Sequence, residues 1–342
     1  MKRGALLMLP ALVVPVAANA QDSLQPPAGV IERPVTVGPL GLPGTLTMPA
    51  GERHHPGVVL VQGSGAADRD ETIGPNKPFR DLAWGLAARG VVVLRYEKRS
   101  KAHPFSFIGR RFTVREEVVE DAVAALTLLR NQPEVDPGRV VVLGHSLGGM
   151  LAPRIAEAAR GTAGMIIMAG PTASITAMIA RQARYLAEQG KAESARTAPQ
   201  LAALDNLAAR IDSLTPADTL STALLLGAPP SYWLDLRNYH PEALADSLAL
   251  PMLILRGARD YQVIAADAAG WRARLGSRKD VRFIEYPGLN HLFLEGSGPP
   301  SPSEYAIPGH VPTRVLDDIA GWLRSLPPRP APHPSGSPSQ AP

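Results

Sequence analysis

The sequence of 342 residues contains no cysteine. This absence excludes a disulfide framework, a thiol nucleophile and a metal site built from thiolates. Because 45% of the residues are hydrophobic, the chain is long and apolar enough to rely on one large core, or on a core that carries an insertion.

Signatures of several ligand classes are also missing. The chain has no basic stripe with interleaved aromatic residues, so its formal charge of +4 gives no reason to expect nucleic acid as a partner. It has no metal-ligand spacing and no phosphate-binding loop. The Gly-x-Gly at Gly63 and Gly65 lacks the third glycine and the acidic residue of a dinucleotide fingerprint. Neither a metal nor a cofactor is therefore expected.

Long apolar runs are confined to the start of the chain. Lys2 and Arg3 precede an apolar stretch over residues 5–18, and Ala-Asn-Ala at residues 18–20 fits a cleavage site. The pattern predicts a secretory signal peptide over residues 1–20, and hence a periplasmic or extracellular protein. The alternative is a retained membrane anchor, but the stretch is short for a span of about 20 residues and contains two prolines. No integral membrane span is expected after processing, which lowers the formal charge to +2.

The rest of the chain alternates short apolar runs with amphipathic segments. The runs predict strands at residues 30–37, 44–48, 58–61, 91–94, 140–143, 165–169, 252–255 and 281–286. The amphipathic segments predict helices at residues 79–89, 114–130, 147–160, 264–275 and 313–323. Strands that alternate with helices form a mostly parallel sheet covered on both faces. The fold class is therefore α/β, with a core built from residues 21–171 and 251–325.

Two segments depart from this alternation. Residues 172–250 are rich in alanine, helical in pattern and without a buried strand, so they predict a helical cap inserted into the core. The alternative is a packed part of the core layer. Residues 326–342 are mostly proline, serine and alanine, which predicts an extended and disordered tail.

The most informative motif is a Gly-x-Ser-x-Gly pentapeptide that directly follows the apolar run at residues 140–143. It places Ser146 between Gly144 and Gly148, and a predicted helix follows. A strand that turns sharply into a helix strains its central residue and crowds side chains two positions away, which explains both glycines. The pattern is typical of a nucleophilic serine. The alternative is an ordinary serine in a glycine-rich turn.

A serine hydroxyl becomes nucleophilic when a base takes its proton, so a histidine and an acid are required. Among the eight histidines, His291 follows the last predicted strand and lies at the edge of the sheet where Ser146 is expected. His145 is expected to point away from the serine. Asp260 follows the preceding strand and could orient the imidazole, or could simply cap the next helix. Asp267 is a competing acid, but it falls inside a helical pattern.

The order Ser146, Asp260, His291 is similar to that of the α/β-hydrolases. Over roughly residues 57–323 the chain resembles bacterial members of the esterase and dienelactone-hydrolase-related group. Secreted bacterial hydrolases share three of its stretches: Gln62-Gly63-Ser64-Gly65, Asp68-Arg69-Asp70-Glu71-Thr72 and Arg259-Asp260-Tyr261-Gln262-Val263. The resemblance implies an α/β-hydrolase fold, with a mostly parallel central sheet flanked by helices and an inserted helical cap.

The resemblance also implies an oxyanion hole in the loop after residues 58–61. Family members often carry His-Gly there, whereas this chain has Gln62-Gly63. The departure should not remove the chemistry, because the donors are backbone amides, assigned by resemblance to Ser64 and Leu147. The alternative for this loop is a plain flexible turn.

A cluster of four charged residues, Asp68 to Glu71, lies beside that loop. Most such runs are solvated surface. The alternative is an ion-pair network that holds the oxyanion loop or binds a polar substrate, with partner charges from Glu97, Lys98 and Arg99 after the next strand.

Together these patterns predict an exported serine hydrolase that cleaves carboxylic esters of small molecules through an acyl-enzyme. Ser146 would be the nucleophile, His291 the base and Asp260 the residue that orients it. Tyr232 and Trp233 near the end of the cap would shape the substrate pocket, unless they are simply core. A peptidase or amidase, a thioesterase, and a binding module that keeps the fold without catalysis are the alternatives.

Overall fold

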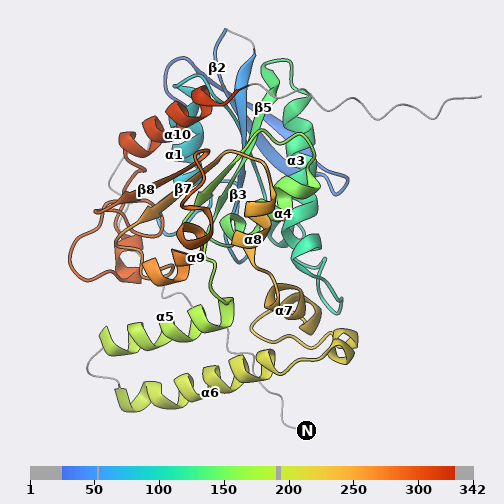
Figure 1. Ribbon diagram of the computed structural model, residues 1–342, viewed down its shortest axis with the longest axis vertical. Coiled ribbons are helices and arrows are strands. Elements are labelled where there is room, and N and C mark those ends of the chain that lie inside the picture. Colours follow the sequence, from blue (N-terminus) through green and yellow to red (C-terminus); the bar gives the residue numbers. More distant parts are fainter. Residues whose placement is uncertain (1–24, 52–53, 190–193, 328–342) are drawn as a thin grey trace, which may run out of the picture.

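A computed structural model describes residues 25–51, 54–189 and 194–327 (Figure 1). The predicted signal peptide and nearly all of the predicted tail lie outside these ranges. The described chain is built on an eight-stranded sheet in the order β1-β2-β4-β3-β5-β6-β7-β8. The strands are β1 (Val30–Val37), β2 (Leu42–Pro49), β3 (His55–Val61), β4 (Val92–Tyr96), β5 (Val135–His145), β6 (Met165–Met168), β7 (Met252–Gly257) and β8 (Val281–Tyr286).

The sheet is mostly parallel, as the alternation of strands and helices predicts. β1 pairs with β2 and β2 with β4 in antiparallel fashion, and every pairing from β4 across to β8 is parallel. Parallel strands covered on both faces must be apolar on both faces. In β3, Val58 and Leu60 pack into the core of one face, and Val59 and Val61 pack into that of the other.

Helices cover both faces of the sheet (Figure 1). Helices α1 (Pro78–Ala87) and α10 (Thr313–Ser325) lie on one face, against a core that includes Phe79 and Trp322. Helices α3 (Glu120–Arg130), α4 (Leu147–Ala158) and α9 (Ala265–Leu275) contribute to the core of the other face. The remaining segments are α2 (Arg99–Ala102), a π-helical turn over Arg115–Val119 that leads into α3, and a 3-10 turn over Pro302–Ala306.

The segment predicted as a cap is helical and lies between β6 and β7. It contains α5 (Ile175–Gln189), α6 (Ser194–Asp212), a 3-10 turn over Pro216–Leu220, α7 (Pro230–Arg237) and α8 (Pro241–Ser247). In Figure 1, α5 and α6 run side by side below the body of the molecule, whereas α7 and α8 lie against it. The inserted segment therefore has an outer pair of helices and an inner pair that packs on the core.

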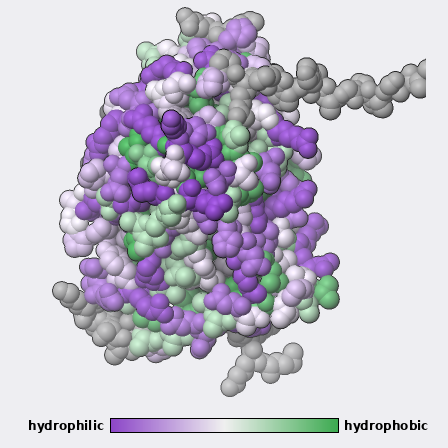
Figure 2. Space-filling view, viewed as in Figure 1, coloured by the Kyte–Doolittle hydropathy of each residue, from purple (hydrophilic) through white to green (hydrophobic). Residues whose placement is uncertain are grey.

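Helix α10 illustrates how sequence pattern sets burial. Its apolar residues recur every three or four positions and are buried, whereas Arg314, Asp317 and Arg324 are exposed. Figure 2 accordingly shows hydrophilic residues over this part of the surface. Among the helices of the described ranges, none has the length and apolar character needed to cross a bilayer.

Candidate active site

Ser146 lies at the sharp turn between β5 and α4. Its backbone has φ 54° and ψ −116°, and a positive φ strains a residue other than glycine. The Ser146 N–H donates to the Met168 carbonyl on β6 at 2.9 Å. A Cβ on Gly144 would lie 2.1 Å from the Gly148 carbonyl oxygen, and one on Gly148 would lie 2.3 Å from that of Val61. Both glycines are therefore required by close backbone approach, as the pentapeptide predicts.

Asp260 and His291 meet at the same edge of the sheet, in the loops that follow β7 and β8. His291 Nδ1 donates to Asp260 Oδ2 at 2.7 Å, and the carboxylate is fully buried. Asp260 Oδ1 accepts the N–H groups of Gln262 and Val263, each at 2.8 Å. One carboxylate thus stabilises the turn into α9 and binds the imidazole, so the two uses that the sequence left open are combined.

The loop of His291 lies against the serine turn. The rings of His145 and His291 have centroids 4.7 Å apart, and His145 directly precedes Ser146. Within the described ranges, no hydrogen bond joins Ser146 Oγ to His291. Such contacts are often long in free enzymes and tighten when substrate binds.

Asp267, the competing acid, has a different position and different partners. It lies in the first turn of α9, where its Oδ2 accepts the Ile264 N–H at 3.0 Å and forms an ion pair with Arg181 of α5. Burial raises the pKa of Asp267, and Ile264 and Arg181 act against that rise. Asp267 therefore joins the cap to the core, and Asp260 is the acid that binds His291.

Arg181 also binds the backbone of the loop that carries Asp260. Its guanidinium donates to the carbonyl of Tyr261 at 3.2 Å and to that of Gln262 at 2.9 Å. Gln182, the next residue of α5, donates to the same Gln262 carbonyl at 2.9 Å. The outer helix α5 is thus anchored to the carbonyls of the two residues that directly follow Asp260.

The loop after β3, which we call the oxyanion loop after its predicted function, lies against Ser146. A Cβ on Gly63 would approach Ser146 Cβ to 3.1 Å, so only glycine fits there without a shift. Ser64, the next residue, is exposed at the rim. Leu147 is the first residue of α4, where an N–H has no acceptor within its own helix. Both amides assigned to the oxyanion hole therefore belong to backbone that borders the serine.

The oxyanion loop is held by Glu71, a buried carboxylate from the charged cluster. Glu71 Oε1 accepts the Gly63 N–H at 2.7 Å and lies 3.0 Å from His145 Nδ1. The other ring nitrogen, His145 Nε2, lies 2.9 Å from the carbonyl oxygen of His291. Glu71 itself has a φ of 52°, so this contact depends on a strained turn. One carboxylate and one imidazole thus connect the oxyanion loop, the serine turn and the His291 loop.

The charge state of His145 responds to these neighbours. Burial favours the neutral ring, but the nearby Glu71 carboxylate, the two hydrogen bonds and the Asp260 carboxylate outweigh it. The pKa of His145 consequently lies above its ordinary value.

The interpretation of the charged cluster as solvated surface is wrong for Asp70 and Glu71. Glu71 is 5% exposed, and Asp70 forms an ion pair with Arg95 of β4, which is itself buried. Arg69 binds Glu97 at 2.8 Å, so the expected partner after β4 is confirmed for this residue. The cluster therefore forms ion pairs, and Glu71 is its member that binds Gly63.

Two further buried side chains, Lys98 and Gln62, hold the same loop by hydrogen bonds. Lys98 Nζ donates to the Gly63 carbonyl at 2.9 Å and pairs with Glu117 at 3.0 Å. Gln62, which replaces the histidine common in this family, is buried and donates to the carbonyls of Tyr96 and Asp68. The departure at Gln62 therefore serves to anchor the loop to the end of β4.

No sequence pattern indicated a function for His145 or a link between His145 and Glu71. Both residues are nearly fully buried, and a buried polar side chain must find hydrogen-bond partners. A histidine directly after the apolar run at residues 140–144 therefore signals partners from other segments. Which segments supply them depends on tertiary contacts between residues 74 positions apart.

The predicted pocket residues have different surroundings. A cavity of about 160 Å³ is lined by Met150, one turn into α4, by residues 172–176 at the start of the cap, and by Trp233. Tyr232 instead packs edge-on against Phe112 with ring centroids 5.8 Å apart. Burial raises the pKa of Tyr232 well above its usual value. Both side chains thus belong to the core, the alternative that the sequence left open, and Trp233 also borders a cavity.

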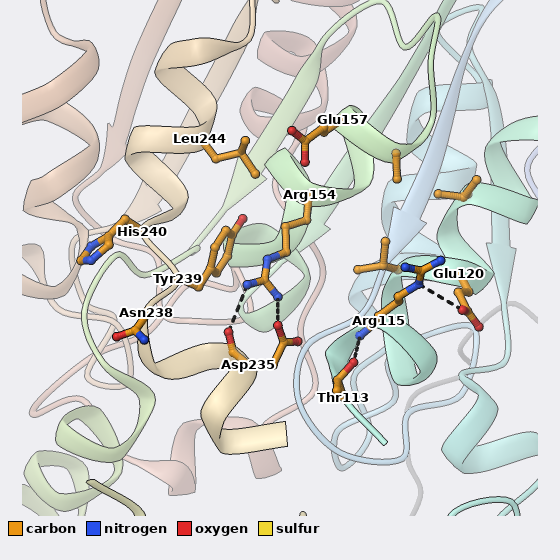
Figure 3. A pocket seen from close by; sticks show the side chains of 13 residues that line it. Thr113, Arg115, Glu120, Arg154, Glu157, Asp235, Asn238, Tyr239, His240 and Leu244 are labelled. Atoms are coloured by element: carbon orange, nitrogen blue, oxygen red, sulfur yellow. Dashed lines mark hydrogen bonds and ion pairs between the residues drawn. The ribbon is translucent and has the colours of Figure 1, made fainter. Parts of the chain in front are cut away.

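A larger groove of about 850 Å³ opens on the flank of α4 (Figure 3). Arg154, two turns beyond the serine, donates to Asp235 Oδ1 at 3.0 Å and to the Asp235 carbonyl at 3.1 Å. The same guanidinium lies 3.9 Å from the centroid of the Tyr239 ring. The residues that line this groove come from the π-helical turn and the residues before it, from α3 and α4, and from residues 235–244 of the inserted segment, and not from the loops of Asp260 and His291.

The site combines a serine in a strained strand-to-helix turn with an acid and a histidine that meet at the carboxyl edge of the sheet. Together with this strand order, the combination defines the class of α/β-hydrolases. The family model of the alpha/beta hydrolase family matches residues 58–306, and the chain belongs to this family.

Relatives agree with this assignment. The chain is 40% identical over 300 residues to esterase EstD of Thermotoga maritima, across 87% of this chain and 68% of EstD. An esterase/lipase from an uncultured bacterium has a TM-score of 0.51 at 16% identity, over 88% of this chain and 86% of that structure. An acylaminoacyl peptidase from Pyrococcus horikoshii has a TM-score of 0.55 at 15% identity, but the chain spans only 42% of it. The predicted relationship to bacterial α/β-hydrolase esterases is confirmed, and the two structures support the fold alone.

Proposed function

We propose that the protein is an exported serine esterase that uses Ser146, His291 and Asp260 as a catalytic triad. The observation that carries the proposal is the buried hydrogen bond between His291 and Asp260, next to a serine whose backbone is strained. Such a pair keeps the proton on Nδ1 of His291 and leaves Nε2 as the base.

The proposed reaction has two stages. His291 Nε2 accepts the Ser146 proton as Oγ attacks the acyl carbon, and the imidazolium then donates that proton to the departing alcohol. In the second stage His291 takes a proton from water, whose oxygen attacks the acyl-enzyme, and returns it to Ser146 Oγ as the acid leaves. Asp260 orients the imidazole and stabilises its charged form throughout.

The oxyanion of both tetrahedral intermediates would be bound by the amides of Ser64 and Leu147. These donors are carried by backbone that is fixed before substrate arrives: Lys98 and Glu71 hold Gly63 at its two ends, and α4 holds Leu147. Each preorganised donor of this kind contributes about 2.7–4 kcal/mol in the transition state.

The kinship with EstD selects ester chemistry. At 40% identity to a named esterase over most of its length, the chain is a carboxylic ester hydrolase. The substrate class is a small-molecule ester, and the 160 Å³ cavity lined by Met150 and Trp233 offers space for part of it. Likeness to the acylaminoacyl peptidase rests on the fold, so amide hydrolysis remains the second activity to assay.

The decisive experiment is covalent labelling with a fluorophosphonate probe. The folded protein is expected to react once, at Ser146, and the Ser146→Ala variant is expected to remain unlabelled and to lose ester hydrolysis by a factor on the order of 10⁶. Parallel assays on a p-nitrophenyl ester and an aminoacyl anilide then compare the two activities. Labelling elsewhere, or faster turnover of the anilide, would contradict the proposal.

Export is tested separately. Residues 1–20 carry the positive start, apolar run and small residues of a signal peptide. N-terminal sequencing of protein recovered from the periplasm or medium is expected to begin at Gln21. A chain that starts at Met1 and stays in the membrane fraction would instead support a retained anchor.

A further inference from the structure

The side chain of His145 is enclosed by two oxygen acceptors. One ring nitrogen faces the Glu71 carboxylate at 3.0 Å, and the other faces the backbone carbonyl of His291 at 2.9 Å. The histidine is 3% exposed and Glu71 is 5% exposed, so water has little access to either. The ring therefore makes its polar contacts with these two oxygens.

A count of hydrogens decides what the ring must be. A carbonyl oxygen and a carboxylate oxygen only accept, and a neutral imidazole carries one N–H. Two hydrogen bonds from His145 therefore require both ring nitrogens to carry hydrogen. Glu71 Oε1 already accepts the Gly63 N–H, which is the pattern of an ionised carboxylate.

We propose that His145 is an imidazolium, paired with the Glu71 carboxylate, that acts as a positioning residue by clamping the His291 loop to the oxyanion loop. The proposal rests on the proposed function, because it gives the clamp its purpose. Through Glu71 the pair holds the Gly63 amide, and through the His291 carbonyl it holds the backbone of the catalytic base. The two halves of the site are thereby kept in a fixed relative position.

The surroundings of the ring favour this charge. The groups that face it are Glu71 from the loop after β3, Asp260 from the loop after β7, His291 from the loop after β8, and the edge of the apolar Phe79 ring from α1. Lys98 is directed at the opposite, carbonyl side of Gly63 and is neutralised by Glu117. Two carboxylates therefore face the His145 cation, and their effect on its pKa outweighs that of burial.

The site also has a carboxylate to compensate the positive charge that His291 acquires during the proposed reaction. The two imidazole rings lie 4.7 Å apart, close enough for two cations to repel. Each ring has its own carboxylate, Glu71 for His145 and Asp260 for His291. The Asp260 carboxylate thus offsets the His291 cation that forms during turnover.

The first test reads the charge directly and needs no activity. In ¹⁵N-histidine-labelled Ser146→Ala protein, NMR is expected to find hydrogens on both His145 nitrogens at about pH 7.5, one unit above the ordinary histidine pKa of about 6.5. The signals are assigned to His145 by their absence from a second protein that carries both Ser146→Ala and His145→Gln. A single N–H on His145 at about pH 7.5, or a neutral ring beside a protonated Glu71, would overturn the proposal.

The second test reads the positioning role in the active enzyme. His145→Gln and Glu71→Gln are each expected to lower kcat on a p-nitrophenyl ester by about 10²-fold while KM changes by less than about threefold. In Glu71→Gln, the pH above which kcat declines should also be lower than in the unaltered protein. The reason is that His145 loses its proton more easily once the Glu71 carboxylate is removed. A merely structural role would leave that pH profile unmoved.

The matched control is His55→Gln. His55 is a partly buried histidine at the start of β3 that binds one carbonyl, that of Gly90, at 3.1 Å. Its kcat and pH profile should equal those of the unaltered protein. Unchanged kcat and pH profile in His145→Gln would refute the clamp. Absence of fluorophosphonate labelling in the unaltered protein would refute the proposed function, while the NMR result would still decide the charge.

Discussion

The loops around Ser146, which we call the rim, and the groove on the flank of α4 both contain polar side chains, but these side chains are held differently. At the rim, Glu71, His145 and Asp260 are buried and hydrogen-bonded to backbone groups of neighbouring loops. In the groove, Arg154 and Asp235 are partly exposed, and the space between the helices is about five times that of the cavity beside Trp233. Catalysis needs polar groups that are fixed before the reaction begins. The size of a cavity is therefore a poor guide to the site, and the rigidity of its polar groups is a better one.

The largest effect should come from the acid that binds His291. Asp260→Asn keeps the shape but removes the charge and favours the wrong tautomer, so kcat on an ester should fall by about 10⁴-fold. Asp267→Asn is the control, because it changes a carboxylate of the same edge that pairs with Arg181 instead. A larger loss of kcat in Asp267→Asn than in Asp260→Asn would reverse the assignment of the acid.

The next effect concerns the oxyanion loop. In Gly63→Leu the new side chain would meet Ser146 Cβ at 3.1 Å and Glu71 Oε1 at 3.3 Å, so the loop must shift. We expect kcat to fall by about 10²–10³-fold, the loss of one oxyanion donor, with little change in melting temperature. Ala66→Leu introduces the same side chain at an exposed position of the same loop and should have little effect on either measurement. Equal losses of turnover and stability in Gly63→Leu would indicate a purely structural turn.

The rim should also differ from the groove in the pH dependence of stability. The pKa of His145 is raised in the folded state, so its contribution is fully present below the unfolded pKa and is lost as the pH rises through the folded pKa. Urea unfolding from about pH 6 to pH 9 should therefore show the unaltered protein losing more stability than His145→Gln above about pH 6.5. Parallel curves for the two proteins would mean that folding does not raise this pKa.

The smallest effect is expected in the groove. Arg154→Ala removes an ion pair with Asp235 and the contact with the Tyr239 ring, which together stabilise the fold by about 1 kcal/mol. Urea unfolding should detect this loss, whereas kcat on esters should change by less than about twofold. A fall of kcat comparable to that of Gly63→Leu would make the groove part of the active site.

The fold, the serine turn and the place of Asp260 and His291 at one edge of the sheet could be predicted because their signals are local. The backbone contacts at Gly144 and Gly148 allow only hydrogen as a side chain, so these two glycines identify the serine turn in the sequence. Asp260 and His291 follow strands that the apolar runs already identify, and parallel strands bring their carboxyl ends to one edge. Each of these inferences needs the strand positions and nothing about distant contacts.

The roles of Glu71 and His145 could not be predicted in the same way. Burial of Glu71 requires a positive φ at a residue that usually avoids it, and Asp68 stabilises that turn by accepting the N–H groups of Asp70 and Thr72. A charged run read alone gives no sign of this conformation. The direction of the His145 side chain likewise matters only because the Glu71 and His291 loops converge on it.

The link from α5 to the acid loop has a consequence for engineering. Arg181 binds the carbonyls of Tyr261 and Gln262, and the Gln262 amide in turn donates to Asp260. A chimera that exchanges these outer helices for those of another hydrolase, in order to alter substrate range, would remove support from the acid as well. Such a graft needs an arginine at the equivalent place, or its altered selectivity will be confounded with a displaced Asp260–His291 pair.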